Sequence, residues 1–221
     1  MSKTPYYSHA GITIYHGDNR EVLAHLGMFD LLLTDPPYGI GESSKKNATR
    51  AKLASARDYG AYSWDSEPAP METINAAIGL CDLSIIWGGN YFSLPPCKGP
   101  LVWDKENSGD FADGELAWNN LGTALRIKRH MWNGMLRKGR EERFHPTQKP
   151  IDVMLWCLSF APDARTVLDP WLGSGTTLVA AKMIGLQATG IELEERYCEI
   201  AATRLQQEML RLDADPEMCN V

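Results

Sequence analysis

Two short segments, far apart in the chain, each place a carboxylate and a tight turn directly after an apolar run. Asp35–Gly39 reads Asp-Pro-Pro-Tyr-Gly and follows the run 29–34, and Asp169–Thr177 follows the run 166–168. Each run predicts a buried strand, and in an open α/β sheet ligands bind in the crevice at the carboxyl ends of the strands. We therefore expect two halves of one reaction site, one for a nucleotide-like cofactor and one for a planar amine.

The segment that begins at Asp35 suits an exocyclic amino group. Its two prolines make it stiff, because each fixes its own φ and restrains the residue before it. The Asp35 carboxylate and the Pro36 carbonyl can then accept both protons of one NH₂ group, which leaves the nitrogen lone pair free to attack a methyl carbon. The ring of Tyr38 can stack on a flat base. A plain proline turn capped by Asp35 is the alternative, and the second segment weakens it.

The second segment has the spacing of an adenosine-binding loop. Gly173 and Gly175 precede a predicted helix, and the next predicted strand ends in Glu192, 19 residues after Gly173. Such glycines let the backbone approach a ligand, the helix start offers free N–H groups, and the acid accepts from ribose hydroxyls. The third glycine of a dinucleotide loop and the lysine of a phosphate-binding loop are absent, and Asp169 adds negative charge. These features favour a cationic cofactor, S-adenosylmethionine, over a glycine turn that only joins strand to helix.

Charge is distributed unevenly along the chain. The formal net charge of −6 alone argues weakly against a nucleic-acid partner. Basic side chains nevertheless gather in residues 45–57 and 126–149, and such stretches can bind a polyanion locally. Aromatic residues interleave the second stretch, which favours a phosphate-facing surface over a solvated face; for the first stretch the two interpretations are about even. The residues that we expect to contact nucleic acid are Lys45, Lys46, Arg50, Lys52, Arg126, Lys128, Arg129, Arg137, Lys138 and Arg140.

Cysteine and histidine usage, together with hydropathy, argue against several classes of protein. The five cysteines form no Cys-x-x-Cys pair, and their odd number favours reduced thiols in a cytoplasm over a disulfide framework. The five histidines show no His-Glu-x-x-His spacing, so we expect no metal site. No signal-peptide core is visible, and no apolar run approaches the ~20 residues of a membrane span.

Alternating strand and helix patterns predict a doubly wound, mostly parallel α/β sheet of the Rossmann-like type in one domain, residues 1–221. Residues from about 40 to 68 follow neither period and predict a long mobile loop. The helical period is also absent from about 104 to 143. We expect strands at 12–15, 29–34, 83–87, 100–103, 116–118, 123–129, 166–169 and 187–192, and helices after residue 18 and at 71–80, 151–160, 174–184 and 194–210.

Taken together, these segments resemble the amino-group DNA methyltransferases, in the circular order that places the Asp-Pro-Pro-Tyr segment first and the cofactor loop last. The resemblance spans nearly the whole chain. It is carried by Gly17-Asp18, Asp35–Tyr38, His145–Pro150, Asp169–Thr177 and Gly190–Glu192, and Trp87–Tyr91 and Val102–Lys105 also look like phage and prophage members.

The resemblance implies roles for the matching residues. It implies the S-adenosylmethionine-dependent methyltransferase fold, with a small inserted target-recognition region at about 104–143 and a DNA-facing loop at about 40–68. Trp171 stands where the family usually has phenylalanine. The implied catalytic residues are Asp35, Pro36, Pro37 and Tyr38. The implied cofactor contacts are Asp18, Thr147, Lys149, Asp169, Trp171, Gly173, Ser174, Gly175, Thr176 and Glu192.

The function that the resemblance implies is site-specific methylation of double-stranded DNA, on the exocyclic amino group of a flipped base. Aspartate at position 35 favours adenine over cytosine, because cytosine enzymes often have serine there. The short target-reading segment suggests a short site, a homodimer or a second subunit, in a bacterial or phage-encoded restriction–modification setting. The alternatives are an amino-group methyltransferase acting on RNA or on a non-nucleic-acid amine, an NAD-dependent oxidoreductase, and a binding subunit without catalysis.

Overall fold

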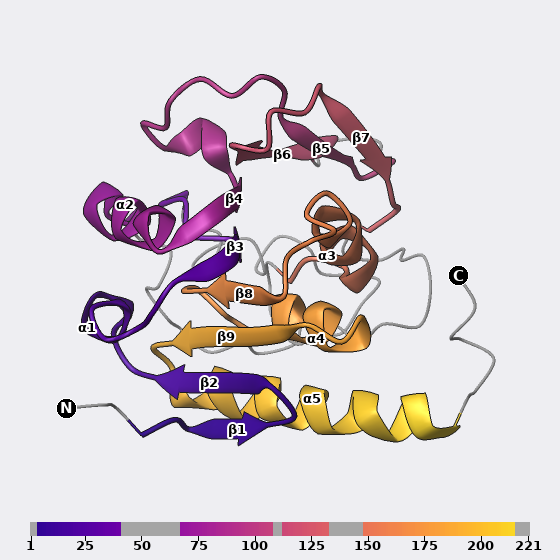
Figure 1. Cartoon of the computed structure of the whole chain (residues 1–221). Helices are drawn as coiled ribbons and strands as arrows, with labels where there is room; N and C mark the ends of the chain where they lie inside the picture. Colours follow the sequence, from indigo (N-terminus) through magenta and orange to yellow (C-terminus); the bar gives the residue numbers. More distant parts are fainter. Residues whose placement is uncertain (1–3, 41–66, 108–111, 133–147, 215–221) are drawn as a thin grey trace, which may run out of the picture.

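The computed structural model describes residues 4–40, 67–107, 112–132 and 148–214. These residues form a nine-stranded sheet in the order β1-β2-β9-β8-β3-β4-β6-β5-β7, which runs from bottom to top in Figure 1. The strands are β1 (Tyr7–His9), β2 (Ile12–His16), β3 (Phe29–Thr34), β4 (Cys81–Trp87), β5 (Leu101–Asp104), β6 (Gly114–Asn119), β7 (Arg126–Arg129), β8 (Thr166–Asp169) and β9 (Gln187–Glu192).

Helices cover both faces of this sheet (Figure 1). The side chains of α1 and α2 pack on one face, and those of α3, α4 and α5 pack on the other. The helices are α1 (Asn19–Leu23), α2 (Met71–Gly79), α3 (Ile151–Leu158), α4 (Thr176–Met183) and α5 (Glu195–Ala214), with a 3₁₀ helix η1 (Gly89–Tyr91) after β4. In the part of the chain that the structure describes, no helix has the length and apolar content to cross a membrane.

The central strand β3 shows why the sheet needs both helical layers. Leu31 and Leu33 point into the core beneath α3 and α4, and Leu32 points into the core beneath α1 and α2. All three side chains are fully buried. Successive side chains alternate between the faces of a strand, so an unbroken apolar run is what a strand buried on both sides requires.

The order in which the chain adds parallel strands reverses between β3 and β8, which makes this pair a topological switch point. Strands β2, β9, β8, β3 and β4 run parallel to one another. From β3 the chain crosses through α2 to β4, and from β8 it crosses through α4 to β9, on the other side. Such a switch point opens a crevice at the carboxyl ends of the two strands. The two segments predicted to form the site follow β3 and β8.

The strand β6 runs antiparallel between β4 and β5, and β7 runs parallel to β5. Because β6 runs backwards, it begins at the edge of the sheet where β3, β4 and β8 end. The described part of the segment 104–143 is therefore built into the main sheet as β6 and β7. Its predicted role in target recognition stays a prediction, and residues 133–143 lie outside the described residues.

The sequence patterns located most of these elements. The strands at 29–34, 166–169 and 187–192 are confirmed at their bounds, and the fold class is confirmed. Helix α4 begins at Thr176 rather than 174, and β7 begins at Arg126 rather than 123. The edge strand β1 was not predicted. The loop predicted at 40–68 lies outside the described residues except at its two ends.

Candidate active site

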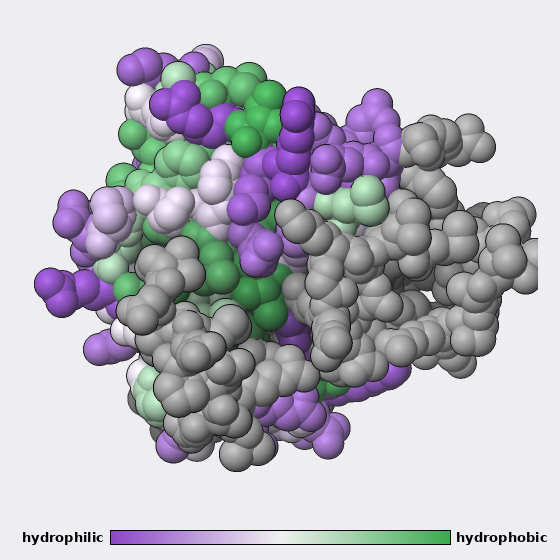
Figure 2. All heavy atoms as spheres, turned by 90° about the vertical axis from the view of Figure 1, so that its right-hand side faces the viewer, coloured by the Kyte–Doolittle hydropathy of each residue, from purple (hydrophilic) through white to green (hydrophobic). Residues whose placement is uncertain are grey.

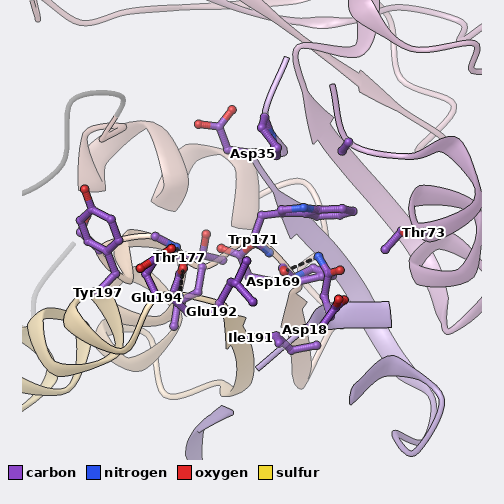
Figure 3. Close-up of a pocket in the computed structure, with 18 of the residues that line it drawn as sticks. Asp18, Asp35, Thr73, Asp169, Trp171, Thr177, Ile191, Glu192, Glu194 and Tyr197 are labelled. Carbon is purple, nitrogen blue, oxygen red and sulfur yellow. Dashed lines mark hydrogen bonds between the residues drawn. The ribbon is translucent and has the colours of Figure 1, made fainter. Parts of the chain in front are cut away.

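A cavity of about 370 Å³ opens at the switch point, which is within the size range of small-molecule sites. Figure 3 shows the ring of Trp171 across its middle, with Asp35 on one side and Asp18 and Asp169 on the other. The cavity walls come from the ends of β2, β3, β8 and β9 and from the residues before α2 and α3. Six acidic residues line it, namely Asp18, Asp35, Glu67, Asp169, Glu192 and Glu194.

A buried hydrogen bond ties the ends of β3 and β8 together. The hydroxyl of Thr34 donates to Oδ1 of Asp169 over 2.7 Å, and the backbone N–H of Trp171 donates to the same oxygen over 3.2 Å. Burial raises the pKa of Asp169 to about 6, although these hydrogen bonds act in the opposite direction. The two segments that the sequence placed in one site therefore form adjoining walls of one cavity.

The glycine loop after β8 places Gly173 and Gly175 in the left-handed region, with φ of +54° and +82°. Gly173 lines the cavity, and its N–H donates to Oε2 of Glu192 over 2.8 Å. Gly175 does not line the cavity. A Cβ atom there would lie 2.7 Å from Cβ of Ala201 in α5. Its small size therefore serves the packing of α4 against α5.

A buried arginine holds the glycine loop from behind. Nη1 of Arg204, in α5, donates to the carbonyl of Ser174 over 2.6 Å and to Oγ1 of Thr176 over 3.1 Å. Ser174 also donates to Oε1 of Gln148 over 3.2 Å. Because Ser174 and Thr176 line the cavity, these hydrogen bonds fix one of its walls.

Glu192 ends β9 with a carboxylate that is already partly engaged. It accepts from the backbone N–H groups of Gly173 and Glu194, each over 2.8 Å. Burial raises its pKa to about 7, against the effect of these donors. A carboxylate offers about four acceptor positions, so this group retains capacity for hydroxyl donors in the cavity.

Asp18 caps the helix α1 at the opposite wall. Its carboxylate accepts from the backbone N–H of Arg20 over 2.9 Å, and Nη2 of Arg20 lies 2.5 Å from Oδ2. Both residues line the cavity, as does Asn19, whose amide donates to the carbonyl of Pro170 over 3.1 Å. The β2–α1 and β8–α4 turns therefore contact each other beside Ile191 (Figure 3).

The carboxylate of Asp35 belongs to a partly buried cluster of charges. Nζ of Lys149 lies 2.6 Å from Oδ2 of Asp35 and 3.0 Å from Oε2 of Glu115, and the Lys149 side chain is only 4% exposed. The other oxygen of Asp35 accepts from the hydroxyl of Tyr38. Lys105 pairs with the remaining oxygen of Glu115. Two acids and two lysines thus neutralise one another at the end of β3.

Burial acts against the charged forms of Asp35, Glu115 and Lys149. It raises the pKa of Asp35, and Lys149 opposes that effect. Burial would likewise raise the pKa of Glu115, but Lys149 and Lys105 together hold it at about 2. The two carboxylates outweigh burial at Lys149 and raise its pKa. Glu115 and Lys149 are therefore charged at neutral pH, and the ammonium of Lys149 favours the charged form of Asp35.

The ring of Tyr38 packs in an aromatic group beside this cluster. It stacks on Tyr91, with centroids 4.9 Å apart and an interplanar angle of 13°. Phe92 meets it edge-on at 6.3 Å. Gly88, with φ of +67°, leaves room for it, because a Cβ atom there would lie 2.0 Å from the ring. Tyr91 therefore covers one face of the ring on which a base was predicted to stack.

Most of the predicted cofactor contacts line the cavity. These are Asp18, Lys149, Asp169, Trp171, Gly173, Ser174, Thr176 and Glu192, and Asp35 and Pro37 of the predicted catalytic set line it as well. Pro36, Tyr38 and Gly175 do not line it, and Thr147 lies outside the described residues. The sequence assigned no role to Lys105, Glu115, Tyr91 or Arg204. Tyr91 and Lys105 end the two segments that resemble phage and prophage members, whereas Glu115 and Arg204 stand in no recognisable motif.

Three of the predicted DNA contacts lie on the edge strand β7, namely Arg126, Lys128 and Arg129. Arg129 ends the strand and lies 3.4 Å from Oδ2 of Asp104. Figure 2 shows hydrophilic and hydrophobic surface side by side at the top of the molecule, the level of β5–β7 in Figure 1. The other predicted contacts lie outside the described residues: Lys45, Lys46, Arg50, Lys52, Arg137, Lys138 and Arg140.

Among the described residues, no three His, Cys, Asp or Glu side chains lie close enough together to bind a metal ion.

Comparison with solved structures identifies the fold. The solved structure of PvuII DNA methyltransferase, which its title calls cytosine-N4-specific, superposes with a TM-score of 0.61 over 95% of each chain. The sequence identity is 14%, so the likeness shows the fold alone: that of the S-adenosylmethionine-dependent methyltransferases.

The sequence comparisons define the family. The model of the N6/N4 methyltransferases, described as DNA methylase, matches residues 98–203. Type II methyltransferase M2.LlaDCHI of Lactococcus lactis subsp. cremoris is 39% identical over 248 residues, which cover 91% of each chain. Type II methyltransferase M.ScaI of Streptomyces caespitosus is 28% identical over 259 residues, covering 92% of this chain and 84% of the relative. The chain belongs to the family of amino-group DNA methyltransferases, which leaves the oxidoreductase alternative without support.

The cofactor of this family is S-adenosylmethionine, and the cavity fits it. The acidic lining suits a ligand with an ammonium and a sulfonium group. The Glu192 carboxylate retains acceptor capacity for hydroxyl donors, and the Trp171 ring offers a flat apolar surface in the middle of the cavity (Figure 3). The carboxylate of Asp35 lies at the same cavity, where an amine can reach it.

Proposed function

We propose that this chain methylates adenine in double-stranded DNA at a specific short sequence, on the exocyclic nitrogen of a base that has left the duplex. The observation that carries the proposal is that Asp35 and the glycine-loop residues Asp169 and Gly173 line the same cavity. One wall thereby offers acceptors for an amino group, and the other suits a methyl donor.

Each wall has residues for its task. We assign the ribose hydroxyls of the cofactor to Glu192, the adenine ring to the space between Trp171 and Ile191, and the cationic methionine end to Asp169 and the Gly173–Ser174 backbone. When bound, S-adenosylmethionine supplies a methyl group on a positively charged sulfur, which leaves as a neutral thioether. The assignments use residues that all line the cavity.

The target amine is positioned by Asp35 and the Pro36 carbonyl. Both accept N–H groups, so the nitrogen lone pair points at the methyl carbon. Transfer of the methyl group to this nitrogen would break the carbon–sulfur bond of the bound cofactor, and the electron pair of that bond would stay on sulfur. The nitrogen then carries a positive charge and releases one proton, for which the Asp35 carboxylate is an adjacent acceptor. Placement of the reacting atoms can supply up to ~7–11 kcal/mol of the rate enhancement.

The base must leave the duplex to reach this cavity, which costs a few kcal/mol. Stacking on an aromatic ring returns about 1–3 kcal/mol. Tyr38 is the candidate ring, and Tyr91 already stacks on one of its faces. The choice of adenine over cytosine rests on aspartate rather than serine at position 35. Mass spectrometry of nucleosides from DNA of cells that express the chain decides between N6-methyladenine and N4-methylcytosine.

Replacement of Asp35 tests the division of labour between the two walls. We expect Asp35→Ala to remove methyl transfer to DNA. Its affinity for S-adenosylmethionine should stay within about threefold of that of the parent, a difference of at most ~0.6 kcal/mol in binding free energy. Labelled cofactor with unmethylated genomic DNA measures the first quantity, and calorimetry measures the second. Asp163→Ala, an exposed acid before β8, is the matched control. Loss of cofactor binding in Asp35→Ala, or full transfer, contradicts the assignment, and equal labelling of RNA and duplex DNA would favour the RNA alternative.

A further inference from the structure

The cluster behind Asp35 contains an acid that no motif includes. Glu115 is the second residue of β6, and its carboxylate bridges Lys149, at 3.0 Å, and Lys105. Lys149 in turn lies 2.6 Å from Oδ2 of Asp35. The chain of contacts therefore runs from β6 through one buried ammonium to the carboxylate at the cavity.

The topology of the sheet produces this meeting. Strand β6 is antiparallel to β4 and β5, so it begins where β3 ends. Lys105 directly follows β5, whose carboxyl end lies at the same edge. Lys149 directly precedes the N-cap of α3, and its Nζ contacts Asp35, the residue after β3. The charged side chains of Lys105, Glu115 and Lys149 thus come from different elements and meet beside Asp35, at the end of β3.

Aromatic rings hold the two lysines in place. Nζ of Lys149 lies 5.2 Å from the ring centroid of Trp87 and 5.8 Å from that of Tyr38. Nζ of Lys105 lies 4.9 Å from the ring centroid of Trp103. The rings of Trp87 and Trp103 meet edge-to-face and are almost fully buried. The rings leave the Lys149 ammonium few alternative positions. Loss of the Glu115 carboxylate therefore leaves this ammonium to interact with Asp35 and Tyr38 from nearly the same place.

We propose that Glu115 is a positioning residue for methyl transfer, which through Lys149 fixes the orientation and the charge of the Asp35 carboxylate. The inference rests on the proposed role of Asp35 as the acceptor for the target amine. With Glu115 in place, the ammonium is shared by two acids, and Asp35 keeps acceptor capacity for the base. Without it, Lys149 pairs with Asp35 alone and competes with the base for the same oxygen.

The segment 104–143, to which Glu115 belongs, is the one predicted to read the target sequence. The network therefore joins that segment to the Asp35 carboxylate by direct contacts. The described titratable groups that face Asp35 and Lys149 are Tyr38 after β3, Lys105 after β5, Glu115 in β6, Cys157 in α3 and Asp169 at the end of β8. Removal of the Glu115 charge takes away a repulsion on Asp35 and an attraction on Lys149, so both pKa values fall.

The test is Glu115→Gln in the full chain, assayed with labelled S-adenosylmethionine and unmethylated genomic DNA over a range of pH. We expect kcat to fall roughly tenfold to hundredfold, as for a misplaced catalytic group, with KM for the cofactor unchanged. Both limbs of the kcat–pH profile should move to lower pH, which a purely structural role would not cause. Glu115→Asp restores the charge and should recover the parent profile and part of kcat.

Asp113→Asn is the matched control, because it removes one acidic charge two residues away at an exposed position. It should leave kcat and the pH profile unchanged. If Glu115→Gln fails to fold, Lys105→Gln decides, since loss of that positive charge leaves Lys149 with less repulsion and should move the alkaline limb to higher pH. An unchanged profile in the variant that folds overturns the inference.

Asp35→Asn separates this inference from the proposed function. If that variant is inactive while Glu115→Gln behaves like the parent, only the role of Glu115 is wrong. If Asp35→Asn transfers methyl groups at the parent rate, the proposed function of the cavity is wrong, and with it the basis of the inference.

Discussion

At the scale of single residues, the two carboxylates deepest in the cofactor half have raised pKa values for the same reason. Burial raises the pKa of Asp169 to about 6 and that of Glu192 to about 7. For an acid whose pKa rises on folding, the stabilising contribution is complete below the unfolded value, near 4.5 for Glu192, and is lost as pH rises through 7. A bound cation reverses this balance, because it favours the charged form of both groups.

The titration of Glu192 predicts a pH-dependent affinity for the cofactor. We expect S-adenosylmethionine to bind more tightly as pH rises from 6 to about 8, where Glu192 becomes charged. Glu192→Gln should weaken binding by roughly tenfold to hundredfold, which corresponds to about 1.5–3 kcal/mol for a hydrogen bond to a charged group, and should flatten the pH dependence. Calorimetry at several pH values measures both.

Glu195→Gln is the control for this variant, because it removes an exposed acid from the start of α5 three residues away. It should bind the cofactor like the parent. DNA retention by Glu192→Gln should also match the parent. An affinity of the parent that does not change between pH 6 and 8 would contradict the assignment of Glu192.

At the scale of elements, the sequence predicted the parts whose signals are local. Strands β3 and β8 are short apolar runs, with an acid directly after β3 and at the end of β8, and each was predicted to carry one half of the site. The structure shows that the two strands are neighbours in the sheet. The position of β6 was not predictable in this way. Its antiparallel pairing with β4 and β5 depends on partners distant in sequence, so neither Glu115 nor its contact with Lys149 had a local signal. Edge strand β1 was missed because three residues carry almost no periodicity.

The packing of Gly175, at the start of α4, against α5 predicts that two glycine-to-alanine variants differ in stability. Gly175→Ala should destabilise the fold by more than Gly185→Ala, because both have positive φ but only Gly175 lacks room for a Cβ atom, which would lie 2.7 Å from that of Ala201. The left-handed conformation alone costs about 1–2 kcal/mol. Each kcal/mol lowers Tm by about 2–4 °C in a chain of this size.

Thermal unfolding without cofactor measures this difference. Gly185 follows the C-terminal end of the same helix and has open space around it, so Gly185→Ala reports the cost of backbone conformation alone. Equal values of Tm in the two variants would show that α5 moves away without cost, and that the close packing of Gly175 does not stabilise the loop.

At the scale of the whole molecule, an acidic chain has to hold a polyanion at the edge of the sheet where the cavity opens. Local basic surface can do so despite the net charge of −6. Strand β7 runs parallel to β5 and, through β6, in the same direction as β3 and β4. Its end at Arg129 therefore lies toward the edge with the cavity, and its start at Arg126 lies toward the opposite edge.

This polarity predicts unequal contributions of the β7 side chains to DNA binding. If DNA crosses the carboxyl edge of the sheet, Lys128→Ala and Arg129→Ala should each weaken binding and reduce the slope of log affinity against log salt by about one. Arg126→Ala should have a smaller effect, and so should Arg165→Ala, an exposed arginine at the amino end of β8. Filter binding of genomic fragments at several salt concentrations measures the slopes. Because Arg129 is also paired with Asp104 at 3.4 Å, Asp104→Asn should strengthen DNA binding by freeing that charge. A larger effect at Arg126 than at Lys128 and Arg129 would place the DNA at the other edge, away from the cavity.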